Sequence, residues 1–434
     1  MRIEIKKTGI NGEGIGYLNR KPVFVSGCFP GEIVDVTITS RQEKYSRGRA
    51  DKIIKRSAHR VESPCAVSSL CGSCPFINLK YQTQLQYKEE ILSETLQKYC
   101  GFSGTFEHMV ASDQLYYRNK VNMPVLADKK GKLNNAMYRP NSNTPVPIDR
   151  CVLHDKKLEQ VRIEVLKVLN RFKMKPYDNQ EKTGIRQLVI RGFSEFQVVL
   201  ITGRNTITYQ LSEAIMAVEG VVSLYQGINT RKNPVSLMPD KITLIAGKPE
   251  IDLQICGYDV RLHPQAFFQL NRKQGARIYE KVRELICDEV SLAVEAYCGV
   301  GVMSLLIHDK CKEVIGIELD RRAVDSARNN ADINGIENVS FKCGDAGSEL
   351  IRLSRKKKPD LLIADPPRTG LSNEFIECVL KSDIKQIIYV SCNPATLARN
   401  IRDLENRYYR ETVIPYDMFP NTPHIETVVS LKRK

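Results

Sequence analysis

Short runs in which apolar and polar residues alternate dominate the first 58 residues. These runs lie at 2–5, 14–18, 22–25 and 32–38, and turns at Asn11-Gly12, Gly27 and Pro30-Gly31 separate them. Alternation with a period of two is typical of half-buried strands, and closely spaced turns are typical of small barrels. Residues 1–58 are therefore predicted to form a small β-barrel.

The pattern changes twice after the barrel. Residues 59–82 are rich in cysteine and turn residues, and 84–99 has the spacing of an amphipathic helix. Residues 110–262 mix the two patterns, with a helix expected at 156–173 and strands expected at 187–191, 197–202 and 221–226. From residue 263 onwards, strand-like and helix-like stretches alternate regularly, as in α/β domains.

Three parts follow from these patterns. The prediction is a barrel over 1–58, a central α+β domain over 59–262 and a Rossmann-like α/β domain over 263–434. The helix at 84–99 is a candidate to pack on the last of these domains.

The net charge of +15 is concentrated in one part of the chain. Residues 263–434 are nearly neutral at +2, so residues 1–262 carry +13. In the barrel an aromatic side chain lies among basic ones, at Arg41, Lys44, Tyr45, Arg47 and Arg49. A solvated barrel face is the alternative, but a charge surplus confined to one region favours a polyanion, most simply RNA.

The chain lacks features of membrane or secreted proteins. It has no run of about 18 apolar residues, and its first residues alternate as in a strand. No membrane partner is expected, and a cytoplasmic location is the default. The 13 cysteines then argue against a disulfide framework, and most of them are expected to be small buried hydrophobes.

A glycine-containing turn marks a predicted cofactor site. The strand-like run 292–297 leads into Cys298-Gly299-Val300-Gly301, and Glu318 ends the next strand 19 residues after Gly299. A carboxylate at that distance can bind ribose hydroxyls, and Asp345 after the third strand can meet an adenine edge. The turn lacks the third glycine of a dinucleotide fingerprint, and no second nucleotide-binding half follows. S-adenosylmethionine is therefore favoured over NAD.

Two further turns carry reactive side chains where strands end. Asp365 lies in Ala364-Asp365-Pro366-Pro367-Arg368, and Cys392 lies in Val390-Ser391-Cys392-Asn393-Pro394, ahead of a predicted helix. A thiol near a helix N-terminus is expected to have a lowered pKa. Cys392 is thus a candidate nucleophile. The rival thiol, Cys298, is expected to pack under the cofactor.

These motifs resemble the RNA uracil-5-methyltransferases, in particular the branch that modifies 23S rRNA. The matching segments are 265–271, 296–301, 316–318, 365–368, 391–394 and His424-Ile425-Glu426-Thr427. The barrel resembles the TRAM domain of that branch. Glu295 and Val302 depart from the family pattern beside the cofactor turn, where Asp and a small hydroxyl residue are usual.

The resemblance implies a mechanism and a set of site residues. Cys392 would add to C6 of uracil, and Glu426 would remove the C5 proton after methyl transfer. Contacts with the cofactor or the base are implied for Gln269, Tyr297, Glu318, Asp345 and Asp365.

A second cysteine group has the spacing of metal ligands. Cys65, Cys71 and Cys74 lie within ten residues, and Cys151 lies far downstream. Four thiolates can hold zinc or an iron–sulfur cluster, and spacing alone does not choose between them. The resemblance implies a [4Fe–4S] cluster with a structural role, which would present Lys80, Arg118 and Lys120 to RNA.

Three functions remain in competition. The first is formation of 5-methyluridine in a loop or single strand of 23S rRNA. The second is the same reaction on tRNA, which the basic barrel and the four cysteines disfavour. The third is a non-catalytic RNA-binding factor, which the joint presence of Cys392, Glu426 and Asp365 disfavours. The modified uridine and the oligomeric state stay open.

Overall fold

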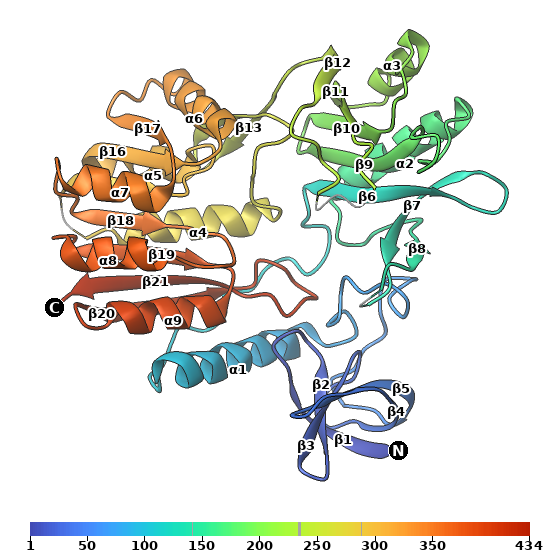
Figure 1. Cartoon of the computed structure of the whole chain (residues 1–434), viewed down its shortest axis with the longest axis horizontal. Coiled ribbons are helices and arrows are strands. Elements are labelled where there is room, and N and C mark those ends of the chain that lie inside the picture. The colour runs from blue at the N-terminus through green and yellow to red at the C-terminus, as the bar shows by residue number, and fades with distance from the viewer. Residues whose placement is uncertain (141, 233–235, 288) are drawn as a thin grey trace. The chain divides into compact units, whose positions relative to one another are not determined.

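The computed structural model describes residues 1–434 except 141, 233–235 and 288. These residues form two compact units (Figure 1). The first unit contains Met1–Ser68, Ser73–Gln114 and Leu350–Lys434, and the second contains Ser69–Gly72 and Leu115–Glu349. The first unit is therefore assembled from segments at both ends of the chain. Among the described helices, none is long and apolar enough to cross a membrane.

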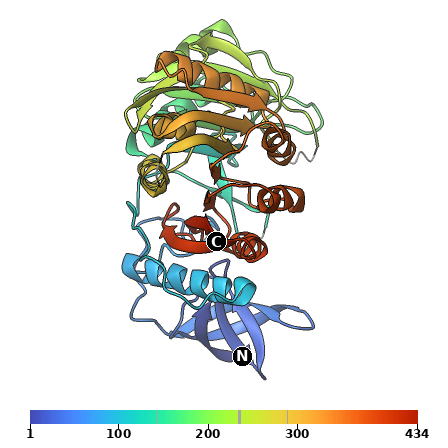
Figure 2. The same cartoon turned by 90° about the vertical axis from the view of Figure 1, so that its left-hand side faces the viewer.

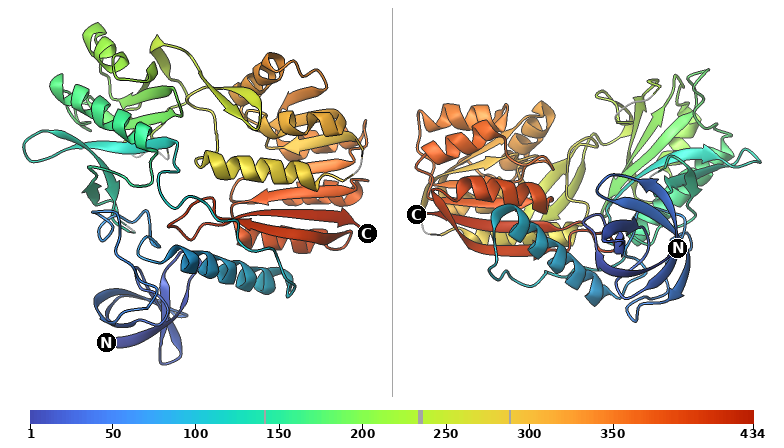
Figure 3. Two further views of the ribbon diagram at one scale, coloured as in Figure 1. Left: turned by 180° about the vertical axis from the view of Figure 1, so that it is seen from behind. Right: turned by 60° about the horizontal axis from the view of Figure 1, so that its bottom comes forward.

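Five strands of the first unit close into a barrel, which confirms the predicted architecture (Figure 3). They are β1 (Arg2–Thr8), β2 (Gly14–Leu18), β3 (Lys21–Val25), β4 (Ile33–Arg41) and β5 (Ser46–Lys55). Their order is β1-β2-β3-β5-β4, and β1 also pairs with β4. Ile5, Val25 and Val34 are fully buried in the barrel core. The alternation thus directs apolar side chains inward and leaves basic ones such as Arg49 outside.

A long helix of the first unit, α1 (Tyr81–Cys100), packs on α9 (Pro394–Leu404) and lies beside the barrel (Figure 2). Lys7 of β1 forms an ion pair with Glu94 of α1. Leu92 and Leu96 are buried on the face that the sequence pattern predicted. The helix ends at Gly101, whose φ of 63° allows its N–H to reach the last carbonyls.

Four strands of the first unit form the part of the sheet that carries the predicted reactive residues. They are β18 (Leu361–Ala364), β19 (Gln386–Ser391), β20 (Tyr408–Tyr416) and β21 (Glu426–Arg433), in the order β18-β19-β21-β20. β18 and β19 are parallel, whereas β21 runs antiparallel to both β19 and β20. The helix α8 (Asn373–Lys381) connects β18 to β19, and α9 follows β19. Every residue of β18 and β19 is buried, as expected for parallel strands covered on both faces.

The second unit begins with a sheet in the order β12-β11-β10-β9-β6-β7-β8. Its strands are β6 (Lys120–Ala127), β7 (Leu133–Tyr138), β8 (Pro145–Pro147), β9 (Ile185–Gly192), β10 (Phe196–Thr202), β11 (Val221–Ile228) and β12 (Thr243–Gly247). The helices α2 (Lys156–Arg171) and α3 (Tyr209–Met216) belong to the same part. The structure therefore confirms the helix expected at 156–173 and the strands expected at 187–191, 197–202 and 221–226.

The rest of the second unit is the α/β half with the glycine turn. A hairpin of β13 (Ile251–Ile255) and β14 (Tyr258–Leu262) precedes it. Parallel strands follow in the order β17-β16-β15. The elements are α4 (Arg272–Leu285), β15 (Val290–Ala296), α5 (Val302–Ile307), the 3-10 helix His308–Lys310, β16 (Cys311–Glu318), α6 (Arg321–Ile333) and β17 (Val339–Cys343). The helix α7 (Ala346–Ser354) begins in the second unit and ends in the first. This is the predicted methyltransferase-type alternation.

The packing of α1 gives a first testable prediction. Replacement Leu92→Ala removes a fully buried side chain and should lower the free energy of unfolding by about 3 kcal/mol, because a cavity remains. Ile54 is 41% exposed on β5, so Ile54→Ala should cost less than about 0.5 kcal/mol. Urea unfolding of the full chain, followed by circular dichroism, measures both. Equal midpoints for the two variants would contradict the assigned core face of α1.

Candidate functional site

Cys392 lies in a rigid turn between β19 and α9. The Oδ1 atom of Asn393 accepts a hydrogen bond from the Ala395 N–H at 3.1 Å and caps α9, and Pro394 occupies the first turn. The Nδ2 atom of Asn393 donates to the carbonyl of Arg368 at 3.0 Å. This bond ties the Cys392 turn to the turn after β18, which carries Asp365. The structure thus brings together the two motifs that the sequence placed at neighbouring strand ends.

Strand register places Glu426 beside the thiol. Ser391 of β19 pairs with Thr427 of β21. The next residue on each strand, Cys392 and Glu426, therefore lies at the same end of the pair. Cys392 is half-buried and Glu426 is buried. A thiol and a carboxyl group thus adjoin although 34 residues separate them in the sequence.

The electrostatics of this group differ from the expectation. Burial raises the pKa of Asp365 to about 7. Burial and the neighbouring Asp365 raise the pKa of Glu426 well above its usual range, against the opposing effect of Arg368. Burial, Glu426 and Asp365 together raise the pKa of Cys392 to about 11. The expected lowering by the helix N-terminus is therefore wrong here, because desolvation and two carboxyl groups outweigh it.

The glycine turn after β15 leaves its backbone accessible. Tyr297, Gly299 and Gly301 have φ values of 66°, 54° and 83°. A Cβ atom at Gly299 would meet no atom within 4 Å, whereas one at Gly301 would lie 2.7 Å from the ring of Phe341. A ligand can therefore approach the backbone closely at Gly299. Gly301 is needed for packing inside the fold.

Three predicted cofactor residues converge on this turn. Glu318 ends β16, and its carboxylate accepts hydrogen bonds from the N–H groups of Gly299 at 3.1 Å and Asp320 at 2.9 Å. Burial raises the pKa of Tyr297, and the charges of Asp345 and Glu318 raise it further, which places the three side chains near one another. Two carboxylates beside an open backbone suit a ligand with ribose hydroxyls and an adenine ring. The side chains around this turn thus fit S-adenosylmethionine.

The segment with Gln269 is held by Asn119, which directly precedes β6. The Nδ2 atom of Asn119 donates to the carbonyl of Gln269 at 2.8 Å, and the Asn119 N–H donates to the carbonyl of Leu270 at 3.0 Å. Gln269 is 7% exposed, whereas Phe267 two residues earlier is 68% exposed. The sequence alone indicates no role for Phe267. An aromatic side chain beside a predicted ligand residue was the signal that could have identified it.

The two departures near the cofactor turn have a local explanation. The carboxylate of Glu295 accepts a hydrogen bond from the hydroxyl of Ser304 on α5, and both side chains are buried. A hydroxyl partner for the acid is therefore present at position 304, while Val302 is buried and apolar. Cys298 is also buried, and burial raises its pKa well above the usual range. These properties agree with packing and not with a nucleophilic role for Cys298.

The second cysteine group stays a prediction. Cys65 and Cys74 belong to the first unit, and Cys71 and Cys151 belong to the second. Within the described part of the chain, no three His, Cys, Asp or Glu side chains are placed to hold a metal ion. The Cys151 N–H donates to the carboxylate of Glu159 at 2.8 Å. The side-chain arrangement adds no support for a cluster beyond the cysteine spacing and the resemblance.

Comparisons with known protein families match nearly the whole chain. The family described as tRNA (Uracil-5-)-methyltransferase matches residues 80–434. The TRAM domain matches residues 1–50, which lie in the barrel.

Relatives with known sequences or structures agree with these matches. An uncharacterized RNA methyltransferase of Bacillus cereus is 34% identical over 445 residues, which cover 100% of this chain and 96% of the relative. Another from Clostridium tetani is 35% identical over 435 residues, which cover 97% and 94%. The crystal structure of Pyrococcus abyssi tRNA (uracil-54, C5)-methyltransferase with S-adenosyl-L-homocysteine is similar, with a TM-score of 0.79 and 26% identity over 99% of this chain and 100% of that one. The chain therefore belongs to the tRNA (uracil-5-)-methyltransferase family and is an S-adenosylmethionine-dependent RNA methyltransferase.

Proposed function

We propose that this enzyme methylates C5 of a uridine in 23S rRNA through a covalent bond between Cys392 and C6. The position of Cys392 and Glu426 at neighbouring ends of β19 and β21 is the observation that carries this proposal. C5 of uracil is a weak nucleophile, and a thiolate that adds at C6 makes it a reactive enolate. A second group must then remove the C5 proton. The two residues supply these two functions.

The proposed reaction proceeds in three steps. The Cys392 thiolate forms a bond to C6, and the electron pair of the C5–C6 double bond moves to the enolate. The enolate C5 then bonds to the methyl group, which leaves the sulfonium of S-adenosylmethionine. Glu426 removes the C5 proton, and the electrons re-form the double bond as the thiolate departs.

The raised pKa values support these roles. A carboxylate whose pKa lies well above its usual range binds a proton strongly, which suits Glu426 for removal of the C5 proton. The Cys392 thiol, with a pKa of about 11, needs a positive charge nearby to ionise at neutral pH. The sulfonium of S-adenosylmethionine carries such a charge.

Exposed aromatic and basic residues support an RNA substrate. The target base must leave its stack to reach Cys392, which favours loops and single strands. Phe267 is 68% exposed and offers a stacking surface of the kind that contributes about 1–3 kcal/mol per base. The barrel adds Arg49, which is 74% exposed, and Arg47, whose guanidinium lies 5.9 Å from the Tyr45 ring centre. Phe267 is thus a proposed stacking surface for a base of the RNA.

tRNA is the second candidate substrate. The Pyrococcus abyssi enzyme is named for uracil 54 of tRNA, and its structure covers 99% of this chain. Because that match includes the barrel, the expectation that the basic barrel disfavours tRNA is wrong. The barrel does not separate the two targets, so 23S rRNA is proposed on the family resemblance alone.

Methyl transfer to RNA tests the proposal. The enzyme, incubated with labelled S-adenosylmethionine and undermodified 23S rRNA, should form 5-methyluridine at a position that nuclease mapping can identify. Undermodified tRNA is the second arm of the same experiment. Labelling of tRNA alone would assign the tRNA function, and labelling at an atom other than uracil C5 would overturn both.

Substitution of the nucleophile should abolish turnover. Cys392→Ala leaves no group to attack C6, so methyl transfer should fall by at least about 1,000-fold, consistent with loss of covalent catalysis. RNA binding, measured by filter retention, should persist. Cys378→Ala is the matched control, because Cys378 is a half-buried thiol of the same unit whose Sγ lies near Ser354. Full turnover by Cys392→Ala would refute the covalent mechanism.

The pH dependence of thiol alkylation tests the electrostatics. Iodoacetamide reacts with thiolates, so alkylation of Cys392 in the free enzyme should accelerate as pH rises towards about 11. Asp365 is ionised above about pH 7 and raises the pKa of Cys392. Asp365→Asn removes this charge and should shift the profile to lower pH. Mass spectrometry of the Cys392 peptide measures the rate, with the Cys378 peptide as internal reference; an unshifted profile would contradict the coupling.

The cysteine group gives a prediction about metal content. Protein purified without oxygen should contain about four irons and absorb visible light, as expected for a [4Fe–4S] cluster on four thiolates. Cys71→Ser should remove the iron, and Cys287→Ser, at an exposed cysteine, should not. Elemental analysis with one zinc and no iron would replace the cluster by a zinc site.

A further inference from the structure

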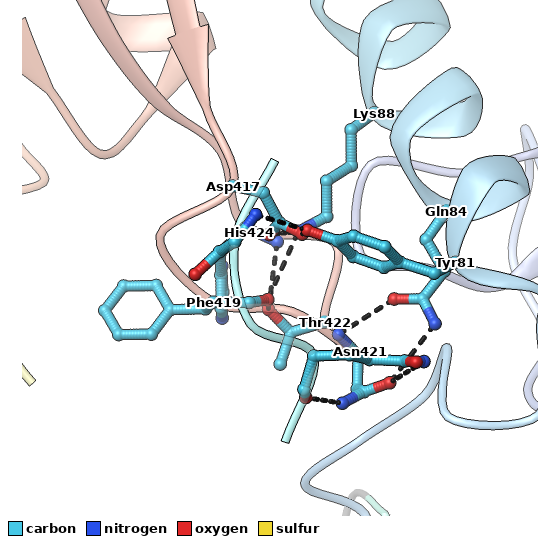
Figure 4. Close-up of polar contacts among 10 residues, drawn as sticks. Tyr81, Gln84, Lys88, Asp417, Phe419, Asn421, Thr422 and His424 are labelled. Carbon is cyan, nitrogen blue, oxygen red and sulfur yellow. Dashed lines mark hydrogen bonds and ion pairs between the residues drawn. The ribbon is translucent and has the colours of Figure 1, made fainter. Parts of the chain in front are cut away.

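The segment 417–425 connects β20 to β21 and leads directly into Glu426. It contains no helix or strand, yet Asp417 and Asn421 are 0% exposed and Ile425 is 2% exposed. Buried irregular backbone needs partners for its polar groups. Those partners come largely from α1 and the residues around it, as Figure 4 shows.

A buried ion pair fixes the start of this segment. Lys88 of α1 and Asp417 form a salt bridge, and both side chains are 0% exposed. The ammonium group of Lys88 also donates to the carbonyl of Phe419 at 3.2 Å. The hydroxyl of Tyr81 donates to the second carboxylate oxygen of Asp417 at 2.9 Å. Asp417 is thus held through both oxygens by two α1 side chains.

Asn421 is fixed through all of its polar groups (Figure 4). Its N–H donates to Gln84 Oε1 at 2.9 Å, and its carbonyl accepts from the Phe76 N–H at 3.0 Å. Its Oδ1 accepts from Gln84 Nε2 at 3.2 Å and from Gln114 Nε2 at 3.0 Å. Its Nδ2 donates to the carbonyl of Gln114 at 2.8 Å. Five hydrogen bonds from three separate chain segments therefore define the place of one residue.

The backbone of Asn421 is itself unusual. Its φ is 67°, in the left-handed region that non-glycine residues seldom adopt. Such a conformation persists only where its surroundings determine it, and it is frequent near functional sites. Two residues later, Pro423 lies against the barrel: a Cβ at Gly12 would be 3.4 Å from its ring. The route from Asn421 to Glu426 is thus constrained at several points.

We propose that Gln84 and Lys88 of α1, with Asn421 and Asp417, are positioning residues that set the place of Glu426. This inference rests on the proposed role of Glu426 as the base that removes the C5 proton. These four side chains need not touch the substrate. They act by holding the segment that delivers the carboxylate, across a sequence separation of 337 residues between Gln84 and Asn421. A purely structural network would stabilise the fold without affecting one chemical step more than another.

The proposed role predicts a selective kinetic defect. Asn421→Gly allows the positive φ but removes the side-chain hydrogen bonds, so Glu426 should be less well placed while the fold is retained. Turnover with RNA should fall about 10–100-fold, since small misplacements have effects of this size, and KM should change less than threefold. Proton removal follows formation of the Cys392–RNA bond, so the methylated adduct should accumulate and appear as a slow band on denaturing gels. Gln84→Leu should show the same pattern. It replaces Asn421→Gly as the test variant if Asn421→Gly is insoluble.

Controls separate this inference from the proposed function and from simple loss of stability. Tyr408→Phe removes one buried hydrogen bond of the same unit, from the Tyr408 hydroxyl to the Ile384 carbonyl at 2.9 Å, and should lower stability without adduct accumulation. Glu426→Gln is the benchmark and should accumulate the adduct. If it does and Asn421→Gly and Gln84→Leu do not, the positioning role is wrong while the mechanism stands. If neither Glu426→Gln nor the wild type forms any adduct, the covalent mechanism itself fails.

Discussion

The antiparallel pairing of β21 with β19 is the constraint on which the proposed catalytic site depends. Because side chains alternate along a strand, a shift of one residue in this pairing would turn Glu426 away from Cys392. Val428 and Val429 of β21 are fully buried, on opposite faces of the strand. Burial on both faces penalises any shift. The core of the sheet therefore determines the geometry of the proposed reaction centre.

This arrangement carries an electrostatic cost that the fold must overcome. Two carboxyl groups and a thiol are gathered where burial disfavours their charged forms, and each carboxyl raises the pKa of its neighbours. Arg368 is the opposing charge, and the Asn393 side chain binds its backbone carbonyl. Perturbed groups of this kind cluster at active sites. The electrostatics and the strand register thus point to the same residues.

Much of the architecture follows from local patterns in the sequence. Alternation of apolar residues was enough to predict the barrel, because Ile5, Val25 and Val34 each lie on a short strand and are buried in the barrel core. Helical spacing of the apolar residues was enough to predict α1, which begins at Tyr81, three residues before the predicted start. Cys392 and Asp365 were identified as candidates because they follow buried strands. The role of Glu426 came from the family resemblance. Local patterns suffice where burial repeats with a simple period.

The rest depends on contacts between distant residues. The sequence shows Cys392 ahead of a helix, which lowers a pKa, but it does not show the burial and the two carboxyls that raise it. It also shows Lys88 and Gln84 as ordinary polar positions of a helix, although both are 0% exposed in the structure. Their partners, Asp417 and Asn421, are separated from them by more than 300 residues. No periodic pattern in the sequence indicates that these distant residues pair.

The first unit is built from segments that lie far apart in the sequence, and this has a consequence for biosynthesis. Lys88 of α1 has its ionic partner at Asp417, and α1 packs on α9, so a ribosome must translate more than 300 further residues before this face of the helix can be buried. During that interval the apolar face around Leu92 is exposed and Lys88 is solvated. Chains emerge at about 5–20 residues per second, so the exposed state lasts on the order of 15–70 seconds for each molecule. The nascent chain therefore exposes this face of α1 until α9 and the segment with Asp417 have been synthesised.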